Sequence, residues 1–120
     1  MSRRPFDQIL SIEDLKITAE RLGNHFFDAD SMRFFDSRVS EHLFWVDGAR
    51  GYFVTSERQK GKPRYWTVRS YEVFTLNGHD VLITDHVGEF QGWTRKGAVQ
   101  EAEKLQGFAK LDIDSFDMER

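Results

Sequence analysis

Residues 64–90 read RYWTVRSYEVFTLNGHDVLITDHVGEF, two segments rich in aromatic and β-branched residues on either side of Asn77-Gly78. Asn-Gly favours a two-residue type I′ turn, because both central positions of that turn need a positive φ. In the first segment alternate side chains belong to opposite faces of a strand: Tyr65, Thr67, Arg69 and Tyr71 to one, and Trp66, Val68 and Ser70 to the other. The stretch therefore predicts an antiparallel hairpin in which residues 66–76 lie beside residues 81–90.

The chain before this hairpin also has the pattern of strands. Residues 43–46 and 51–56 are apolar or β-branched segments, and the turn residues Asp47-Gly48 lie between them. Residues 58–63, RQKGKP, form a polar connection to the hairpin. Between residues 25 and 39 two phenylalanine pairs flank turn-forming residues, which predicts two short strands or a strand and a turn.

Two segments have the apolar spacing of amphipathic helices. Residues 12–22 follow Ser11, which can cap a first turn, and precede Gly23, which favours a left-handed stop. Residues 95–106 repeat the pattern between Thr94 and Gly107. The order of elements predicts a single α+β domain over residues 1–110. We expect an antiparallel meander-like sheet of about four or five strands, with the N-terminal and C-terminal helices packed on one face.

The composition excludes several classes of protein. The chain has 120 residues, no cysteine, and 17 Lys and Arg against 20 Asp and Glu, which gives a formal net charge of −3. Without Cys there is no thiol catalysis, no zinc site with Cys ligands and no iron–sulfur cluster. No apolar segment approaches the ~20 residues of a membrane span, and the N-terminus lacks a secretion signal. We therefore expect a soluble, cytoplasmic protein.

Candidate catalytic groups have unfavourable spacing. His79-Asp80 and Asp85-His86 carry side chains that bind metals, but adjacent residues of a strand point to opposite faces. Many nucleases need Glu-x-Lys after an Asp, but Glu57 and Lys60 give Glu-x-x-Lys instead, and on a strand this spacing turns the Lys away from the Glu. The sequence also has no nucleophile elbow and no phosphate-binding loop. We predict no enzyme activity, no cofactor and no metal site.

The polar connection and the start of the next strand form the clearest cluster of positive charge, opposed only by Glu57. The last predicted helix also begins with two cations, where the macrodipole is already positive and an anion is favoured. Cations that track phosphates and rings that stack on bases hold single-stranded nucleic acid, although lysines at a sheet edge also prevent aggregation. One hypothesis is therefore a nucleic-acid-binding module with these binding residues: Arg58, Lys60, Lys62, Arg64, Trp66, Arg95 and Lys96.

Two charged segments are candidates for an interface with a protein partner. Residues 28–38 combine three aspartates with two arginines, and residues 111–120 form an acidic C-terminal tail that also carries apolar side chains. Turn-capping aspartates and local ion pairs also explain the first segment, and the tail can dock either on its own domain or on a partner. The residues predicted for partner binding are Asp28, Asp30, Arg33, Asp36, Arg38, Asp112, Asp114 and Phe116.

Four short segments between residues 24 and 105 have a familiar sequence and order: FFDADSMRFFDSRV at 26–39, YFVTSE at 52–57, YWTVR at 65–69 and VGEFQG at 87–92. On these segments the chain resembles a family of small uncharacterised proteins encoded by phages and plasmids. The resemblance implies an accessory protein of a mobile genetic element. Our first hypothesis is a non-enzymatic protein that binds and modulates or inhibits a host macromolecule, such as a defence component, in the manner of an anti-CRISPR protein. The nucleic-acid-binding module is the alternative, and the oligomeric state stays open.

Overall fold

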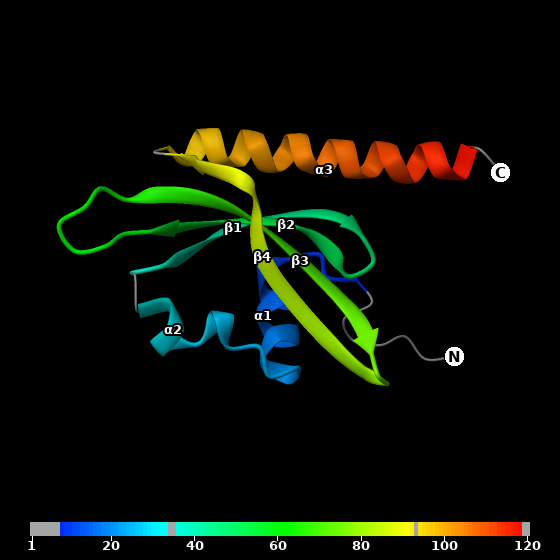
Figure 1. Ribbon diagram of the computed structural model, residues 1–120, viewed down its shortest axis with the longest axis horizontal. Coiled ribbons are helices and arrows are strands. Elements are labelled where there is room, and N and C mark those ends of the chain that lie inside the picture. The colour runs from blue at the N-terminus through cyan, green and yellow to red at the C-terminus, as the bar shows by residue number, and fades with distance from the viewer. Residues whose placement is uncertain (1–7, 34–35, 93, 119–120) are drawn as a thin grey trace.

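The computed structural model describes residues 8–33, 36–92 and 94–118, with backbone alone for residues 31, 88–92 and 112–118 (Figure 1). Its elements, in chain order, are helix α1 (Ile12–Arg21), the 3-10 turn η1 (His25–Phe27), the short helix α2 (Ala29–Arg33), strands β1 (Arg38–Asp47), β2 (Arg50–Glu57), β3 (Tyr65–Leu76) and β4 (His79–Gly92), and the long helix α3 (Arg95–Met118). No helix in this described part is both long and apolar enough to cross a membrane.

The hairpin predicted around Asn77-Gly78 is confirmed. Asn77 and Gly78 have φ of 53° and 81°, as the type I′ turn requires. Strands β3 and β4 pair antiparallel, from Leu76 opposite His79 to Trp66 opposite Gly92. Strands β1 and β2 pair in the same sense, as do β2 and β3. The sheet is therefore an antiparallel meander of four strands in the order β1-β2-β3-β4, and the predicted α+β class is confirmed.

Each face of the sheet has its own hydrophobic core. Phe53 and Val54 are neighbours on β2 and project to opposite faces, yet both are fully buried. On the first face, the residues that pack with Phe53 are Ile9, Ile12, Leu15, Ala19, Tyr71 and Leu82. On the second face, the residues that pack with Val54 are Phe44, Val68, Ala98 and Ala102. Figure 1 accordingly shows α1 and α3 on opposite sides of the sheet.

The prediction that both helices pack on one face is therefore wrong. Strands β2 and β3 carry apolar side chains on both faces, and each apolar face must be removed from water. One face is covered by α1 and the other by α3, so the molecule has three layers with the sheet in the middle. The difference matters for function, because it places the start of α3 against a face that α1 does not reach.

The helix predicted at residues 12–22 is confirmed as α1. Its first turn is capped by Ser11, whose hydroxyl accepts a hydrogen bond of 3.1 Å from the Asp14 amide. After the helix ends, Gly23 takes a φ of 74°, the left-handed conformation that glycine adopts at little cost.

The last helix does not end at Gly107 as the sequence predicts, since α3 continues to Met118. One glycine inside a helix costs only about 1 kcal/mol, and the next residues, 108–111, include good helix formers. Residues 111–118 of the predicted acidic tail therefore continue the backbone of α3.

For residues 25–39 the sequence predicts two short strands or a strand and a turn, but residues 25–33 form no strand, because η1 and α2 occupy this part of the segment. The Asn24 side chain accepts a hydrogen bond of 2.8 Å from the Phe26 amide and so begins the turn. Phe26 and Phe27 then pack on the Phe53 ring, with centroid distances of 5.9 and 6.0 Å. Burial against the core overrides the strand propensity of the phenylalanines. The second pair, residues 34–35, lies outside the described residues.

Candidate functional site

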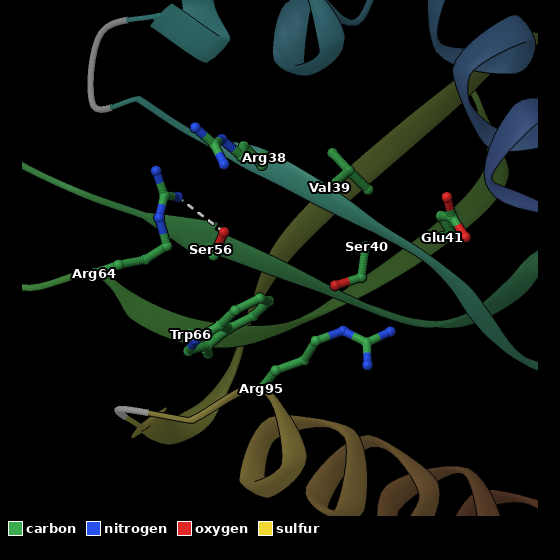
Figure 2. A pocket seen from close by; sticks show the side chains of 8 residues that line it. All are labelled: Arg38, Val39, Ser40, Glu41, Ser56, Arg64, Trp66 and Arg95. Atoms are coloured by element: carbon green, nitrogen blue, oxygen red, sulfur yellow. Dashed lines mark hydrogen bonds between the residues drawn. The ribbon is translucent and has the colours of Figure 1, made fainter.

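Three segments that are distant in the sequence meet at one end of the sheet: the start of β1, the junction of β2 and β3, and the first turn of α3. Between them lies a pocket of about 290 Å³, shown from close by in Figure 2. Its charged lining residues are Arg38, Glu41, Arg64 and Arg95. The lining also includes the Trp66 ring and Ser56, whose hydroxyl forms a hydrogen bond. Three guanidinium groups and one indole ring thus border one cavity, which we call the arginine pocket.

Arg64 is held in place by three hydrogen bonds. Its Nη1 atom donates to the buried Ser56 hydroxyl over 2.9 Å and to the Asp36 carbonyl oxygen over 3.1 Å, and its Nη2 atom donates to Asp36 Oδ2 over 2.7 Å. The contact with Ser56 is the dashed line in Figure 2. A guanidinium fixed in this way has already lost most of its rotational freedom, so an anion that binds to it pays little further entropy.

Asp36 contacts two of the arginines that line the pocket. Its Oδ1 atom lies 3.9 Å from Arg38 Nε, while its Oδ2 atom accepts from Arg64. The residue has a φ of 46°, a left-handed conformation that Asp tolerates better than most residues. Because half of the Asp36 side chain is exposed, its carboxylate is an anion that an incoming ligand can compete with.

The side of the pocket next to α3 is formed by Trp66 and Arg95 (Figure 2). Trp66 is half-buried, since one part of it packs on the core formed by Val54 and Val68. Arg95 is the first residue of α3, and the predicted Thr94 cap is confirmed by a hydrogen bond of 3.1 Å from the Gly97 amide to the Thr94 hydroxyl. The positive end of the helix dipole therefore faces the same region as the arginines, which favours an anion there.

Several cations at this end of the sheet have no acidic partner among the described side chains, while Glu41 supplies one carboxylate to the lining of the arginine pocket. Among the side chains that the structure describes, Arg58, Lys60, Lys62, Arg95 and Lys96 form no ion pair. Glu57, which the sequence places next to these cations, does not neutralise them. It is buried on the α1 face, where Arg69 pairs with it over 2.8 Å.

The structure brings most of the predicted nucleic-acid residues together. Arg64, Trp66 and Arg95 line the arginine pocket. Arg58 and Lys60 line a neighbouring pocket of about 300 Å³. Lys62 and Lys96 are exposed but line neither of these two pockets, so the site that the structure defines does not include them.

Sequence reasoning missed that Arg38 and Ser56 belong to this site. The register of β1 and β2 sets Arg38 directly opposite Ser56. The sequence indicates only that each residue belongs to a predicted β segment or to its flank. The pairing that joins them to Arg64 could not be derived from local patterns.

The residues predicted for partner binding are not gathered into one surface. His25 Nδ1 lies 2.9 Å from Asp28 Oδ2, and Arg33 Nη2 lies 3.9 Å from Asp30 Oδ1, so both aspartates have local ionic contacts. Arg38 lines the arginine pocket instead, and Asp36 contacts Arg38 and Arg64 there. The side chains of Asp112, Asp114 and Phe116 lie outside the described part of the structure. Their backbone belongs to the far end of α3, at the opposite end of the molecule from α2 (Figure 1).

A buried polar cluster on the α1 face was also missed. Glu57 Oε1 accepts hydrogen bonds from Thr55 Oγ1 over 2.7 Å and from Arg69 Nη2 over 2.8 Å. The Arg69 guanidinium also lies 5.0 Å from the centre of the Phe26 ring. Among the side chains that the structure describes, Glu57 Oε2 and Thr67 Oγ1 are buried and have no hydrogen-bond partner. We call Thr55, Glu57, Thr67 and Arg69 the buried polar cluster.

The histidine and aspartate pairs considered as metal ligands lie on β4. Asp80 Oδ1 accepts a hydrogen bond of 2.8 Å from Thr75 Oγ1, and Asp85 Oδ1 accepts one of 2.8 Å from the His86 amide. Within the described residues, no three His, Asp or Glu side chains gather in a way that could hold a metal ion.

Comparison with known proteins adds one finding. The model of a family of unknown function, DUF7447, matches residues 11–104. No curated protein and no solved structure matches the chain. The matched range contains the whole sheet and all residues of the arginine pocket.

Proposed function

We propose that this chain, which belongs to the family of unknown function DUF7447, is a non-enzymatic module that binds single-stranded nucleic acid. The observation that carries the proposal is the arginine pocket, where three guanidinium groups and the Trp66 ring border one cavity. The arginines supply the contacts to phosphate, and the indole supplies a surface for a base.

The chemistry of arginine favours phosphate as the anion. A guanidinium presents its N–H groups as a planar fork that matches two phosphate oxygens at once. Arg64 already donates two such bonds to Asp36, which shows that its fork is directed toward an oxygen-bearing partner. A phosphate that replaces the Asp36 carboxylate there also reaches Arg38, which borders the same pocket.

The size of the pocket and its aromatic wall favour a single strand. Ligand pockets usually measure roughly 300–1,000 Å³, so a cavity of about 290 Å³ is at the small end of this range and suits one unit of a strand. Stacking on an indole also requires an unpaired base. The net charge of −3 means that binding depends on the local cluster of cations, and affinity should fall steeply with added salt.

Fluorescence anisotropy with labelled single strands of about 12 nucleotides, at ~50 mM salt, tests this proposal. We expect binding to DNA or RNA of any sequence, with a slope of log affinity on log salt of about −2 if three phosphates are contacted. Arg95→Gln should weaken binding about tenfold, since Arg95 is exposed and its loss removes one phosphate contact without disturbing the fold.

Arg21→Gln is the matched control, because it removes the same charge from the end of α1, outside the arginine pocket. It should stay within about twofold of the wild type. Equal losses for Arg95→Gln and Arg21→Gln, or no binding by the wild-type protein at low salt, would show that the arginine pocket does not bind nucleic acid.

A protein partner is the second candidate function, and one observation favours it. Phe108 and Leu111 on α3 have exposed fractions of 54% and 60%, and the acidic tail continues the same helix. Exposed apolar side chains beside a charged segment are typical of a helix that docks on a partner. We keep with this candidate the phage or plasmid origin implied by the resemblance, which makes the partner a host macromolecule.

Truncation at residue 110 separates the two candidates. We expect the shortened domain to stay folded, with a melting temperature within a few degrees of the full chain. Capture of a host protein that resists nuclease treatment and is lost on truncation would support the protein partner. Capture that disappears with nuclease would support nucleic acid instead.

A further inference from the structure

A second basic pocket adjoins the arginine pocket at Asp36. It measures about 300 Å³, and its lining side chains are Arg33, Asp36, Arg58 and Lys60. Arg33 comes from the end of α2, and Arg58 and Lys60 from the connection between β2 and β3. Asp36 lines this second pocket and also pairs with Arg64, which lines the first. The ion pair between Asp36 and Arg64 therefore connects the two pockets.

The cations of the second pocket are available to a ligand. Arg58 and Lys60 are exposed, and neither has an ion pair among the side chains that the structure describes. Arg33 contacts Asp30 only at 3.9 Å, with both side chains mostly exposed, which is a weak pairing that salt screens.

Two further carboxylates beside these cations, Asp36 and Glu57, are both engaged by other arginines. Asp36 accepts from Arg64 over 2.7 Å, so it neutralises the first pocket more than the second. Glu57, the residue just before Arg58, points into the interior and pairs with Arg69. The second pocket therefore keeps an excess of positive charge, and its natural occupant is an anion.

We propose that this second pocket is another phosphate subsite, so that the ligand is a strand with at least two phosphates and not a single nucleotide. This inference rests on the proposed function. One phosphate lies among Arg38, Arg64 and Arg95 while its base faces Trp66, and a later phosphate lies among Arg33, Arg58 and Lys60. Asp36, whose carboxylate the first phosphate displaces from Arg64, lies between the two sites, and the residue therefore sets where along the strand the two contacts fall.

A length series with two matched variants tests the subsite. Lys60→Gln removes a cation that lines the second pocket, and Lys62→Gln removes one that lies two residues further along the same connection and lines neither pocket. Each variant is measured with thymidine monophosphate and with oligothymidylates of up to about 12 nucleotides, by calorimetry or by competition in anisotropy. Both lysines are exposed, so we expect both variants to fold, and a thermal melt checks this.

The wild-type affinity should rise sharply once the strand is long enough to reach the second pocket. Lys60→Gln should lose about fivefold or more on the long strands and stay within about twofold on the mononucleotide. Lys62→Gln should stay within about twofold on all lengths.

Two results overturn the subsite in different ways. Equal weakening by Lys60→Gln and Lys62→Gln on long strands would mean that the connection supplies diffuse charge only, while the arginine pocket still binds nucleic acid. If the wild-type protein binds neither the mononucleotide nor any oligonucleotide at low salt, the proposed function fails, and the subsite fails with it.

Discussion

Two arginine–carboxylate pairs include residues next to the β2–β3 connection, and the pairs differ in burial rather than in length. Arg69 Nη2 lies 2.8 Å from Glu57 Oε1, and these side chains have exposed fractions of 15% and 5%. Arg64 Nη2 lies 2.7 Å from Asp36 Oδ2, where the fractions are 20% and 52%. The first pair is sealed into the α1 face, whereas the second borders two pockets.

The buried pair of Arg69 and Glu57 therefore stabilises the fold, whereas the exposed pair of Arg64 and Asp36 can exchange its carboxylate for another anion. When a buried charge loses its partner, it has no water to replace that partner, so the fold depends on the pair. When an exposed carboxylate is displaced, water solvates it and another anion can take its place. The α1 face should therefore respond to mutation through stability, and the basic end of the sheet through binding.

The largest effect is expected at the buried polar cluster. Arg69→Met leaves the Glu57 carboxylate buried without a cation and should lower the free energy of unfolding by about 3–5 kcal/mol, measured by urea denaturation. The double variant Glu57→Gln/Arg69→Met should recover part of this loss, because it buries no unpaired charge. A loss below about 1 kcal/mol for Arg69→Met would place this pair in the same class as the exposed one.

Two glycines extend the comparison to the backbone. A Cβ at Gly51 on β2 would lie 2.5 Å from Tyr71 Oη and 2.6 Å from the Phe44 carbonyl oxygen, so Gly51→Ala should cost about 3 kcal/mol through overpacking. At Gly61, in the β2–β3 connection, φ is +79°, and an added Cβ would have no atom within 4 Å apart from Gly61 itself and its two chain neighbours. Gly61→Ala should therefore cost only about 1 kcal/mol of backbone strain. Equal losses in urea denaturation would contradict this view of the two regions.

Tyr71 makes the α1 face sensitive to alkaline pH. Burial, followed by the charges of Asp14 and Asp47, raises the pKa of Tyr71 above its ordinary value. A raised pKa contributes stability that is present below the unfolded pKa of about 10 and is lost as the pH rises above it, at about 1.4 kcal/mol per pH unit. The stability of the wild-type protein relative to Tyr71→Phe should therefore fall as the pH rises above 10.

Below that pH, Tyr71→Phe should be less stable than the wild type by about 1 kcal/mol, because it loses the hydrogen bond of 3.1 Å from Tyr71 Oη to the Ile9 carbonyl oxygen. By about pH 11 the order of stability should reverse. Urea denaturation of both proteins between about pH 9 and 11 measures the difference, and a difference that stays constant over this range would refute the role of Tyr71 ionisation.

The smallest effect on stability is expected at the exposed pair. Asp36→Asn keeps a residue that tolerates the left-handed conformation and should change the free energy of unfolding by less than about 1 kcal/mol. Binding of single-stranded DNA should tighten about threefold, since the competing carboxylate is gone. Glu20→Gln removes the same charge from the exposed side of α1 and should leave the affinity unchanged. A similar gain for both variants would point to net charge and not to displacement of Asp36.

Local patterns gave correct predictions where the structure depends on neighbouring residues. The Asn77-Gly78 turn, the alternation along residues 65–71 and the Ser11 cap each involve a few consecutive residues, and each is confirmed. The predictions failed where a distant contact decides. Phe26 and Phe27 leave the strand conformation to pack on Phe53, and Gly107 lies within α3 instead of ending it.

The sequence by itself determined the strands, the two helices and the cluster of cations between β2 and β3, because strand alternation, turn chemistry and charge are properties of short segments. Only the tertiary structure decided which cations share a site. The register of β1 against β2 sets Arg38 opposite Ser56, the placement of α3 on the Val54 face brings Arg95 to the pocket of Trp66, and burial removes Glu57 from the basic connection to pair with Arg69. These outcomes follow because both apolar faces of one sheet must be removed from water. The way in which distant elements cover the two faces cannot be inferred from any short segment alone.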